Sequence, residues 1–145
     1  MIKVAENEAM DFIKDMYESY KDKNISGYVV AFSGGKDSQV ILDLVSRVIP
    51  AGNYRVVFTN TGMELPCTID TVEETRTFYK EKYPEFTLEH AKSDKKAIEL
   101  WKSYGPPSRM NRWCCSVLKT ALFGRKMKEL LKTEAQPKLV VFEGV

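Results

Sequence analysis

Residues 33–38 read Ser-Gly-Gly-Lys-Asp-Ser and lie between the apolar run 28–32 and a segment, 40–49, whose apolar residues recur at helical spacing. A glycine turn therefore joins a predicted strand to a predicted helix. The first N–H groups of a helix lack internal partners and lie at the positive end of its dipole, so an anion bound there accepts several hydrogen bonds. This pattern predicts a phosphate-binding loop.

The side chains of the loop suit that purpose. Gly34 and Gly35 can adopt positive φ and let the backbone approach a ligand closely. Lys36 adds a mobile positive charge, and the hydroxyls of Ser33 and Ser38 can donate hydrogen bonds. An ordinary strand-to-helix turn needs neither two glycines nor a lysine between two hydroxyls.

Asp37 would repel a phosphate, so we expect it to cap the first helical turn, to order the loop or to hold a magnesium ion. Two better-known phosphate loops do not match. A Walker A loop needs glycine where Val30 stands and Ser or Thr where Asp37 stands, and a dinucleotide fingerprint needs a third glycine where Ser38 or Gln39 stands.

The loop instead resembles the PP-loop of the adenine nucleotide alpha-hydrolase-like superfamily, whose signature is Ser-Gly-Gly-x-Asp-Ser after the first strand. That superfamily includes ATP pyrophosphatases that adenylate their substrates, tRNA-thiolating enzymes, ATP sulfurylase small subunits and phosphoadenosine phosphosulfate (PAPS) reductases. The loop alone does not separate these enzymes.

Later segments resemble the PAPS reductases. Residues 56–66 look like the family's second strand and its outgoing loop, with Asn60 in place of the usual aspartate and with Thr61 and Gly62 retained. The end of the chain, 140–145, resembles the strand that the family runs into an Arg and a Glu-Ser pair. With the segment described next, the resemblance spans residues 28–145.

Residues 105–119 resemble the Arg-Trp-Cys-Cys segment and Lys-containing helix of archaeal-type PAPS reductase-like proteins. Arg109 and Arg112 could grip a phosphate or sulfonate with paired hydrogen bonds, Lys119 adds a charge and Trp113 offers an apolar face. A solvated basic loop with Trp113 in the core is the alternative interpretation.

The cysteines leave the redox chemistry open. Cys114 and Cys115 resemble the pair that ligates a [4Fe-4S] cluster in adenylyl sulfate reductases, but the downstream Cys-x-x-Cys pair is not in this sequence, and Cys67 fits no cluster pattern. We expect no cluster in this chain, although a full-length protein could hold one. The family's nucleophilic cysteine lies in a C-terminal tail, a position that none of these three occupies.

Strand and helix signals alternate along the chain. Strands are predicted at 28–33, 55–60, 86–90 and 138–144, and helices within 1–25 and at 37–49, 66–82, 94–103 and 116–131. This order predicts a Rossmann-like, doubly wound, mainly parallel α/β sheet with the PP-loop after the first strand. Ligands of such sheets bind at carboxyl strand ends where the strand order reverses, so we expect residues 33–38 beside 60–62, with adenine near the first two strands.

Some further side chains are expected to be structural. The aromatic residues Tyr79, Tyr83, Phe86 and Trp101 are predicted to lie in the core. His90 has no second histidine at ligand spacing, which favours a structural or surface residue over a metal ligand.

Composition favours one domain over residues 1–145, C-terminally truncated because the chain ends within a predicted strand. Of its residues, 43% are hydrophobic, and no apolar run approaches the ~20 residues of a membrane helix. The absence of a signal peptide and the three cysteines favour a reducing cytoplasm. A net charge of +2 neither predicts nor excludes a nucleic-acid partner.

The resemblance implies a PAPS reductase-like domain that binds PAPS or adenylyl sulfate for thiol-dependent reduction to sulfite, with a thioredoxin-type reductant as possible partner. Two alternatives stay open: an ATP pyrophosphatase that uses ATP-Mg and adenylates a substrate for sulfur transfer to tRNA or DNA, and a non-catalytic nucleotide-binding module. A homo-oligomer is possible.

Catalytic candidates are Lys36, Arg112 and Lys119. The predicted nucleotide-binding residues are Ser33, Gly34, Gly35, Lys36, Asp37, Ser38, Asn60, Thr61, Gly62, Arg109, Arg112, Trp113 and Lys119.

Overall fold

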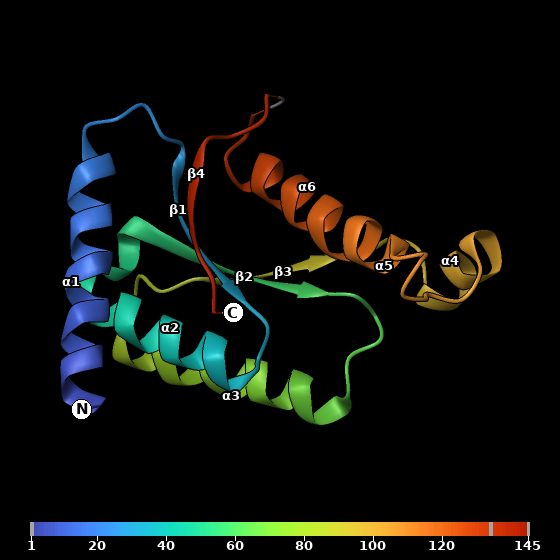
Figure 1. The fold of residues 1–145 in the computed structure, drawn as a ribbon, viewed down its shortest axis with the longest axis horizontal. Coiled ribbons are helices and arrows are strands. Elements are labelled where there is room, and N and C mark those ends of the chain that lie inside the picture. The colour runs from blue at the N-terminus through green and yellow to red at the C-terminus, as the bar shows by residue number, and fades with distance from the viewer. Residues whose placement is uncertain (1, 134, 145) are drawn as a thin grey trace.

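The computed structural model describes residues 2–133 and 135–144. Its centre is a four-stranded sheet in the order β3-β2-β1-β4, in which every pair of neighbours is parallel (Figure 1). The strands are β1 (Gly27–Phe32), β2 (Tyr54–Asn60), β3 (Leu88–Lys92) and β4 (Leu139–Phe142). The predicted parallel α/β architecture is confirmed.

Helices cover both faces of the sheet (Figure 1). They are α1 (Ile2–Lys21), α2 (Lys36–Val48), α3 (Pro66–Lys82), α4 (Ala97–Tyr104), α5 (Trp113–Cys115) and α6 (Ala121–Leu130), with a 3-10 turn η1 (Ala51–Asn53) and a π-helical turn η2 (Ser116–Thr120). No helix within 2–133 or 135–144 is long and apolar enough to cross a membrane.

Two apolar clusters hold the layers together. Val30 of β1 and Val56 of β2 pack with α1, α2 and α3 on one face, whereas Val29 and Val57 pack with α4, α5 and α6 on the other. Both faces of the central strands are therefore buried, which explains why β1 and β2 read as continuous apolar runs rather than alternating ones.

The starts of three elements differ by two or more residues from the sequence-based prediction, and β4 ends at Phe142 rather than at residue 144. Strand β3 begins at Leu88 rather than at residue 86, because Phe86 lies in the preceding turn and packs against Tyr79 with ring centroids 5.2 Å apart. Helix α4 begins at Ala97 rather than at 94. The predicted helix 116–131 begins instead at Trp113 and contains the π-helical turn.

The prediction that Trp101 lies in the core is wrong. Its side chain is 40% exposed, and the neighbouring Leu100, which is 5% exposed, makes the core contact of α4. Tyr79 and Phe86 are buried as expected, and Tyr83 packs against the same cluster while partly exposed.

The strand order reverses between β1 and β4, not between β1 and β2. The chain leaving β4 therefore passes beside the start of α2. A Cβ atom on Gly144 would lie 2.8 Å from the backbone carbonyl of Asp37, so only glycine fits this close approach. This crossing brings residues 143 and 144 beside the glycine loop. The sequence-based prediction had placed residues 60–62 there.

Candidate nucleotide-binding site

The glycine loop between β1 and α2 has the predicted turn, formed by one glycine rather than two. Gly34 has a φ of +78°, and a Cβ there would lie 3.2 Å from Thr68 Cγ2 and 3.3 Å from Val72 Cγ2 of α3. Gly35 is the N-terminal cap residue of α2 with a φ of −81°, so it does not use the positive φ that glycine permits.

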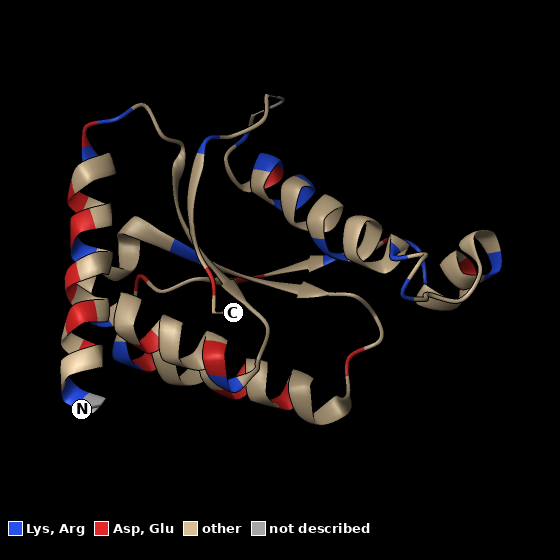
Figure 2. Cartoon of the chain, viewed as in Figure 1, with Lys and Arg blue, Asp and Glu red and all other residues tan. Residues whose placement is uncertain are grey.

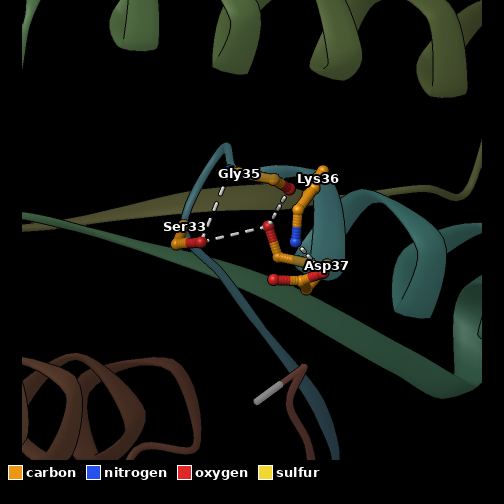
Figure 3. A network of polar contacts seen from close by, with 5 residues as sticks. Ser33, Gly35, Lys36 and Asp37 are labelled. Atoms are coloured by element: carbon orange, nitrogen blue, oxygen red, sulfur yellow. Dashed lines mark hydrogen bonds and ion pairs between the residues drawn. The ribbon is translucent and has the colours of Figure 1, made fainter.

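Hydroxyl groups hold the loop in shape (Figure 3). Ser38, which is buried, donates its hydroxyl to the Gly35 carbonyl at 2.8 Å, and Ser33 Oγ donates to Ser38 Oγ at 3.1 Å. Ser33 Oγ also accepts the Gly35 N–H at 3.4 Å. The loop is thus fixed by its own side chains at the positive end of the α2 dipole.

Lys36 and Asp37 form an exposed ion pair, with Lys36 Nζ 2.7 Å from Asp37 Oδ1 (Figure 3). The expectation that Asp37 caps α2 is wrong, because the cap residue is Gly35 and the Asp37 carboxylate bonds instead to Lys36. Lys36 is 88% exposed and turned to this carboxylate. Asp37 therefore offsets part of the positive charge that Lys36 would offer to a phosphate.

A cavity of about 400 Å³, here called the loop pocket, opens beside the glycine loop. It lies at the carboxyl ends of β1, β2 and β4, where parallel sheets of this kind hold their ligands. Its lining residues are Ala31, Phe32, Ser33, Ser38, Val57, Phe58, Thr59, Glu64, Lys119, Thr120, Phe123, Val141, Glu143 and Gly144.

Lys119 reaches the loop pocket from a distant part of the sequence. It belongs to the π-helical turn Ser116–Thr120, which joins α5 to α6 and brings both Lys119 and Thr120 to the cavity. Such turns are frequent at functional sites. Lys119 is the one lysine or arginine among the described residues that line this pocket.

Two carboxylates in the loop pocket were not predicted as site residues. Glu64 accepts a 2.8 Å hydrogen bond from the hydroxyl of Thr61, which is itself buried, and Glu143 follows β4. Glu64 follows Thr61 by three residues, the spacing of a loop-closing side-chain bond, which is the signal that could have identified it. Glu143 gave no such signal, since its position depends on the pairing of β4 with β1.

Residues 60–62 do not line the loop pocket. The Asn60 side-chain oxygen accepts the Gly62 N–H at 2.9 Å, and Gly62 has a φ of +77°. These residues shape the turn after β2 and border a second cavity of about 570 Å³, here called the basic pocket. Its lining residues are Asn60, Thr61, Gly62, Met63, Lys92, Ser93, Asp94, Lys95, Lys96, Ala97, Ile98 and Trp101.

The predicted binding residues of segment 105–119 are also dispersed. Arg109 is exposed and lines neither pocket, and Trp113 is 6% exposed with its Nε1 donating to the Gly105 carbonyl at 3.0 Å. Arg112 Nη2 lies 3.7 Å from Cys115 Sγ, and this contact lowers the pKa of the Cys115 thiol. Of this group, the structure brings Lys119 alone to the glycine loop.

The described residues do not provide a ligand set for a [4Fe-4S] cluster. Cys114 and Cys115 are adjacent and half-buried, and Cys67 is exposed at the start of α3. Within 2–133 and 135–144, no three His, Cys, Asp or Glu side chains lie close enough to hold a metal ion together. The described thiols therefore do not fit a four-thiolate cluster.

Residues 27–139 match the family model of the phosphoadenosine phosphosulfate reductase domain. The chain belongs to that family. An adenosine 5'-phosphosulfate reductase of Geobacillus kaustophilus is 33% identical over 116 residues, covering 77% of this chain and 44% of that relative. The family binds adenine nucleotide substrates, which agrees with a glycine loop at the strand-to-helix turn.

Other relatives have no assigned activity. An uncharacterized protein of Methanocaldococcus jannaschii is 32% identical over 140 residues, covering 97% of this chain and 26% of that protein. This member of the reductase family thus spans less than half the length of these curated relatives.

Among solved structures, the NH3-dependent NAD synthetase of Campylobacter jejuni, in complex with a nitrate ion, aligns with a TM-score of 0.62 at 14% identity. The alignment covers 90% of this chain and 53% of the synthetase. At this identity the likeness concerns the fold alone, and it agrees with a parallel sheet flanked by helices.

Proposed function

We propose that this domain binds an adenosine sulfonucleotide, adenylyl sulfate or PAPS, in the loop pocket for thiol-dependent reduction to sulfite. The observation that carries the proposal is that Ser33 and Ser38, the two ends of the glycine loop, line one cavity with Lys119, although 80 residues lie between Ser38 and Lys119. A helix N-terminus and a lysine together suit the phosphate-sulfonate end of such a nucleotide.

The remainder of the pocket suits an adenosine. Its apolar walls come from Phe32 and Phe58 at the ends of β1 and β2, and about 400 Å³ is within the usual range for small-ligand pockets. Glu64 and Glu143 can accept hydrogen bonds from ribose hydroxyls. The nucleotide would thus lie with its anionic end at the start of α2 and its sugar beside the two carboxylates.

The proposed reaction needs two thiols. A thiolate attacks the sulfonate sulfur, the bond between that sulfur and the bridging oxygen breaks, and the nucleoside phosphate leaves with the bond's electron pair. A second thiolate then attacks the first thiol's sulfur in the resulting thiosulfonate, a disulfide forms between the two thiols, and the bond to the sulfonate breaks so that sulfite departs with its electron pair. The two thiols together lose the two electrons that the sulfonate gains.

The attacking and resolving thiols are proposed to come from outside the described residues. None of Cys67, Cys114 and Cys115 lines the loop pocket, so the attacking thiol would come from another part of a longer protein and the resolving thiol from a thioredoxin-type partner. Such thiols stay reduced in a cytoplasmic environment. Lys119 would stabilise the negative charge on the departing phosphate.

Calorimetric titration with adenylyl sulfate, PAPS and ATP-Mg in parallel tests the proposal. We expect a sulfonucleotide to bind at least tenfold more tightly than ATP-Mg, a difference of about 1.4 kcal/mol. Preference for ATP-Mg would overturn it and favour the adenylating sulfurtransferase, with Asp37 as the candidate magnesium contact. Binding without sulfite release, when dithiothreitol supplies the thiols to the full-length protein, would favour a non-catalytic module.

A further inference from the structure

Charge is distributed very unevenly over the chain. Segment 92–128 contains ten of the 22 lysines and arginines but two of the 20 aspartates and glutamates, which leaves the remainder of the sequence with 12 against 18. Figure 2 shows most of the acidic residues on α1, α2 and α3, and basic residues around α4 and the loop that follows it. The net charge of the whole chain is small because the basic segment and the more acidic remainder nearly cancel.

The cations nearest α4 are not neutralised by the protein itself. Among the described residues, no carboxylate lies within 4.0 Å of the basic groups of Lys92, Lys95, Lys96, Lys102, Arg109 and Arg112. By contrast, Arg47 on α2 bonds to both Glu6 and Asp43. Unpaired cations on one side of a molecule attract polyanions and steer them to it.

The basic pocket lies among these cations. Lys92, Lys95 and Lys96 line it, and its acidic residue, Asp94, lies 3.4 Å from Arg125. Trp101, 40% exposed, contributes an aromatic surface to the same cavity. Figure 1 shows α4 projecting beyond the sheet. Lys95, Lys96 and Lys102 are exposed there, so a long ligand can reach them.

We infer that single-stranded nucleic acid binds here, with a base in the basic pocket against Trp101 and its phosphates along the lysines of segment 92–102. Single-strand-binding surfaces combine these two elements, a basic track and an aromatic stacking surface. An acidic peptide could pair with the lysines, but it has no base to stack on Trp101. A duplex could also pair with the lysines, but its bases are stacked on one another and are not free to contact the tryptophan. The inference goes beyond the proposed function, which uses the loop pocket.

Fluorescence anisotropy with labelled 20-nucleotide uridine and thymidine oligomers, titrated at several salt concentrations, tests the inference. In K95E/K96E we expect weaker binding and a log-log salt dependence shallower by about 1.4, because each neutralised phosphate of a single strand contributes about 0.7. The matched variant K14E/K21E makes the same charge change on α1 and should bind as the unaltered chain does. Equal losses in both variants would overturn the assignment.

The aromatic surface is tested by W101A and W101F. Stacking of one base predicts that W101A lowers affinity by about five- to 150-fold while W101F keeps most of it. Equal affinity of W101A and the unaltered chain, or competition by polyglutamate or duplex as effective as that of unlabelled single strand, would overturn the inference. Sulfonucleotide titration of the same variants should be unchanged, which keeps this result separate from the function of the loop pocket.

Discussion

The loop pocket and the basic pocket both open at the carboxyl ends of the strands, yet they are built in opposite ways. In the loop pocket, Ser38 is buried and bonded to the glycine loop, and Glu64 is held by Thr61. In the basic pocket, Lys95 and Lys96 are exposed and no carboxylate pairs with them among the described residues. The first cavity has a preset shape suited to one small ligand, and the second attracts by charge and adapts to a larger one.

The largest effect is expected from Gly34→Val, which should distort the turn beside the loop pocket. A valine would have to adopt positive φ and press on Thr68 and Val72. Together these costs amount to roughly 2–4 kcal/mol of unfolding free energy. Urea denaturation measures this loss, and calorimetry should show nucleotide binding lost.

Gly35→Ala is the matched control for that substitution. At this position φ is already negative, and the nearest atom to a new Cβ, Ser33 Oγ, lies at an ordinary 3.4 Å. A loss of stability equal to that of Gly34→Val would contradict the assignment of the turn to Gly34.

Lys119→Ala should weaken sulfonucleotide binding by about 1.5–3 kcal/mol, the range for hydrogen bonds to charged groups. Lys36→Ala should cost less, because Lys36 is 88% exposed and engaged with Asp37. Calorimetry of both variants compares them. If Lys36→Ala proved the more damaging, the anion would lie outside the loop pocket, over the exposed ion pair.

Glu64→Gln should change which sulfonucleotide is preferred. A 3'-phosphate beside two carboxylates is repelled, so the unaltered domain should favour adenylyl sulfate over PAPS. The glutamine keeps an acceptor for the Thr61 hydroxyl and removes one charge. We expect the preference to fall about fivefold, on the order of 1 kcal/mol for partly screened charges. Competition binding measures the ratio, and Glu74→Gln, an exposed site on α3, should leave it unaltered.

The smallest effect concerns β3, which borders the basic pocket. Burial lowers the pKa of His90 from 6.5, with Lys92 and Arg76 acting in the same direction and Glu73, 3.0 Å away, opposing them. The folded state therefore binds fewer protons than the unfolded chain below about pH 6.5. His90 should leave stability unaffected above that pH and reduce it as the pH falls.

Urea denaturation at pH 7.5 and 5.5 measures this effect, with His90→Gln as the comparison. The stability difference between the two pH values should be smaller in the variant, since its side chain does not titrate. An equal difference in both proteins would show that His90 does not contribute to acid sensitivity.

The sequence predicted well whatever depends on local pattern. Ser-Gly-Gly-Lys-Asp-Ser after an apolar run identified the turn, and alternating strand and helix signals predicted the parallel sheet. The strand order could not be read from such patterns, because β4 pairs with β1 through contacts between distant residues. Glu143 and Gly144 at the loop pocket, and the separation of residues 60–62 from it, follow from that pairing.

Trp101 and Trp113 show the same limit on a smaller scale. Both are tryptophans in or beside short helices, yet Trp113 is buried with its Nε1 bonded to Gly105, whereas Trp101 is half-exposed because Leu100 takes the core position of α4. Helical spacing in an eight-residue segment does not determine which neighbour faces the sheet. The tryptophan predicted to meet the nucleotide is therefore in the core, and the one predicted for the core lines a cavity.

The crossing of Gly144 over the start of α2 has a consequence for the newly made chain. The glycine loop is synthesised early, but the wall formed by Val141, Glu143 and Gly144 is made more than 100 residues later. A chain still held by the ribosome short of residue 144 carries the phosphate loop without the finished cavity. We expect nucleotide capture to begin after β4 and Gly144 have left the exit tunnel, so that the ligand stabilises the assembled pocket and does not guide its assembly.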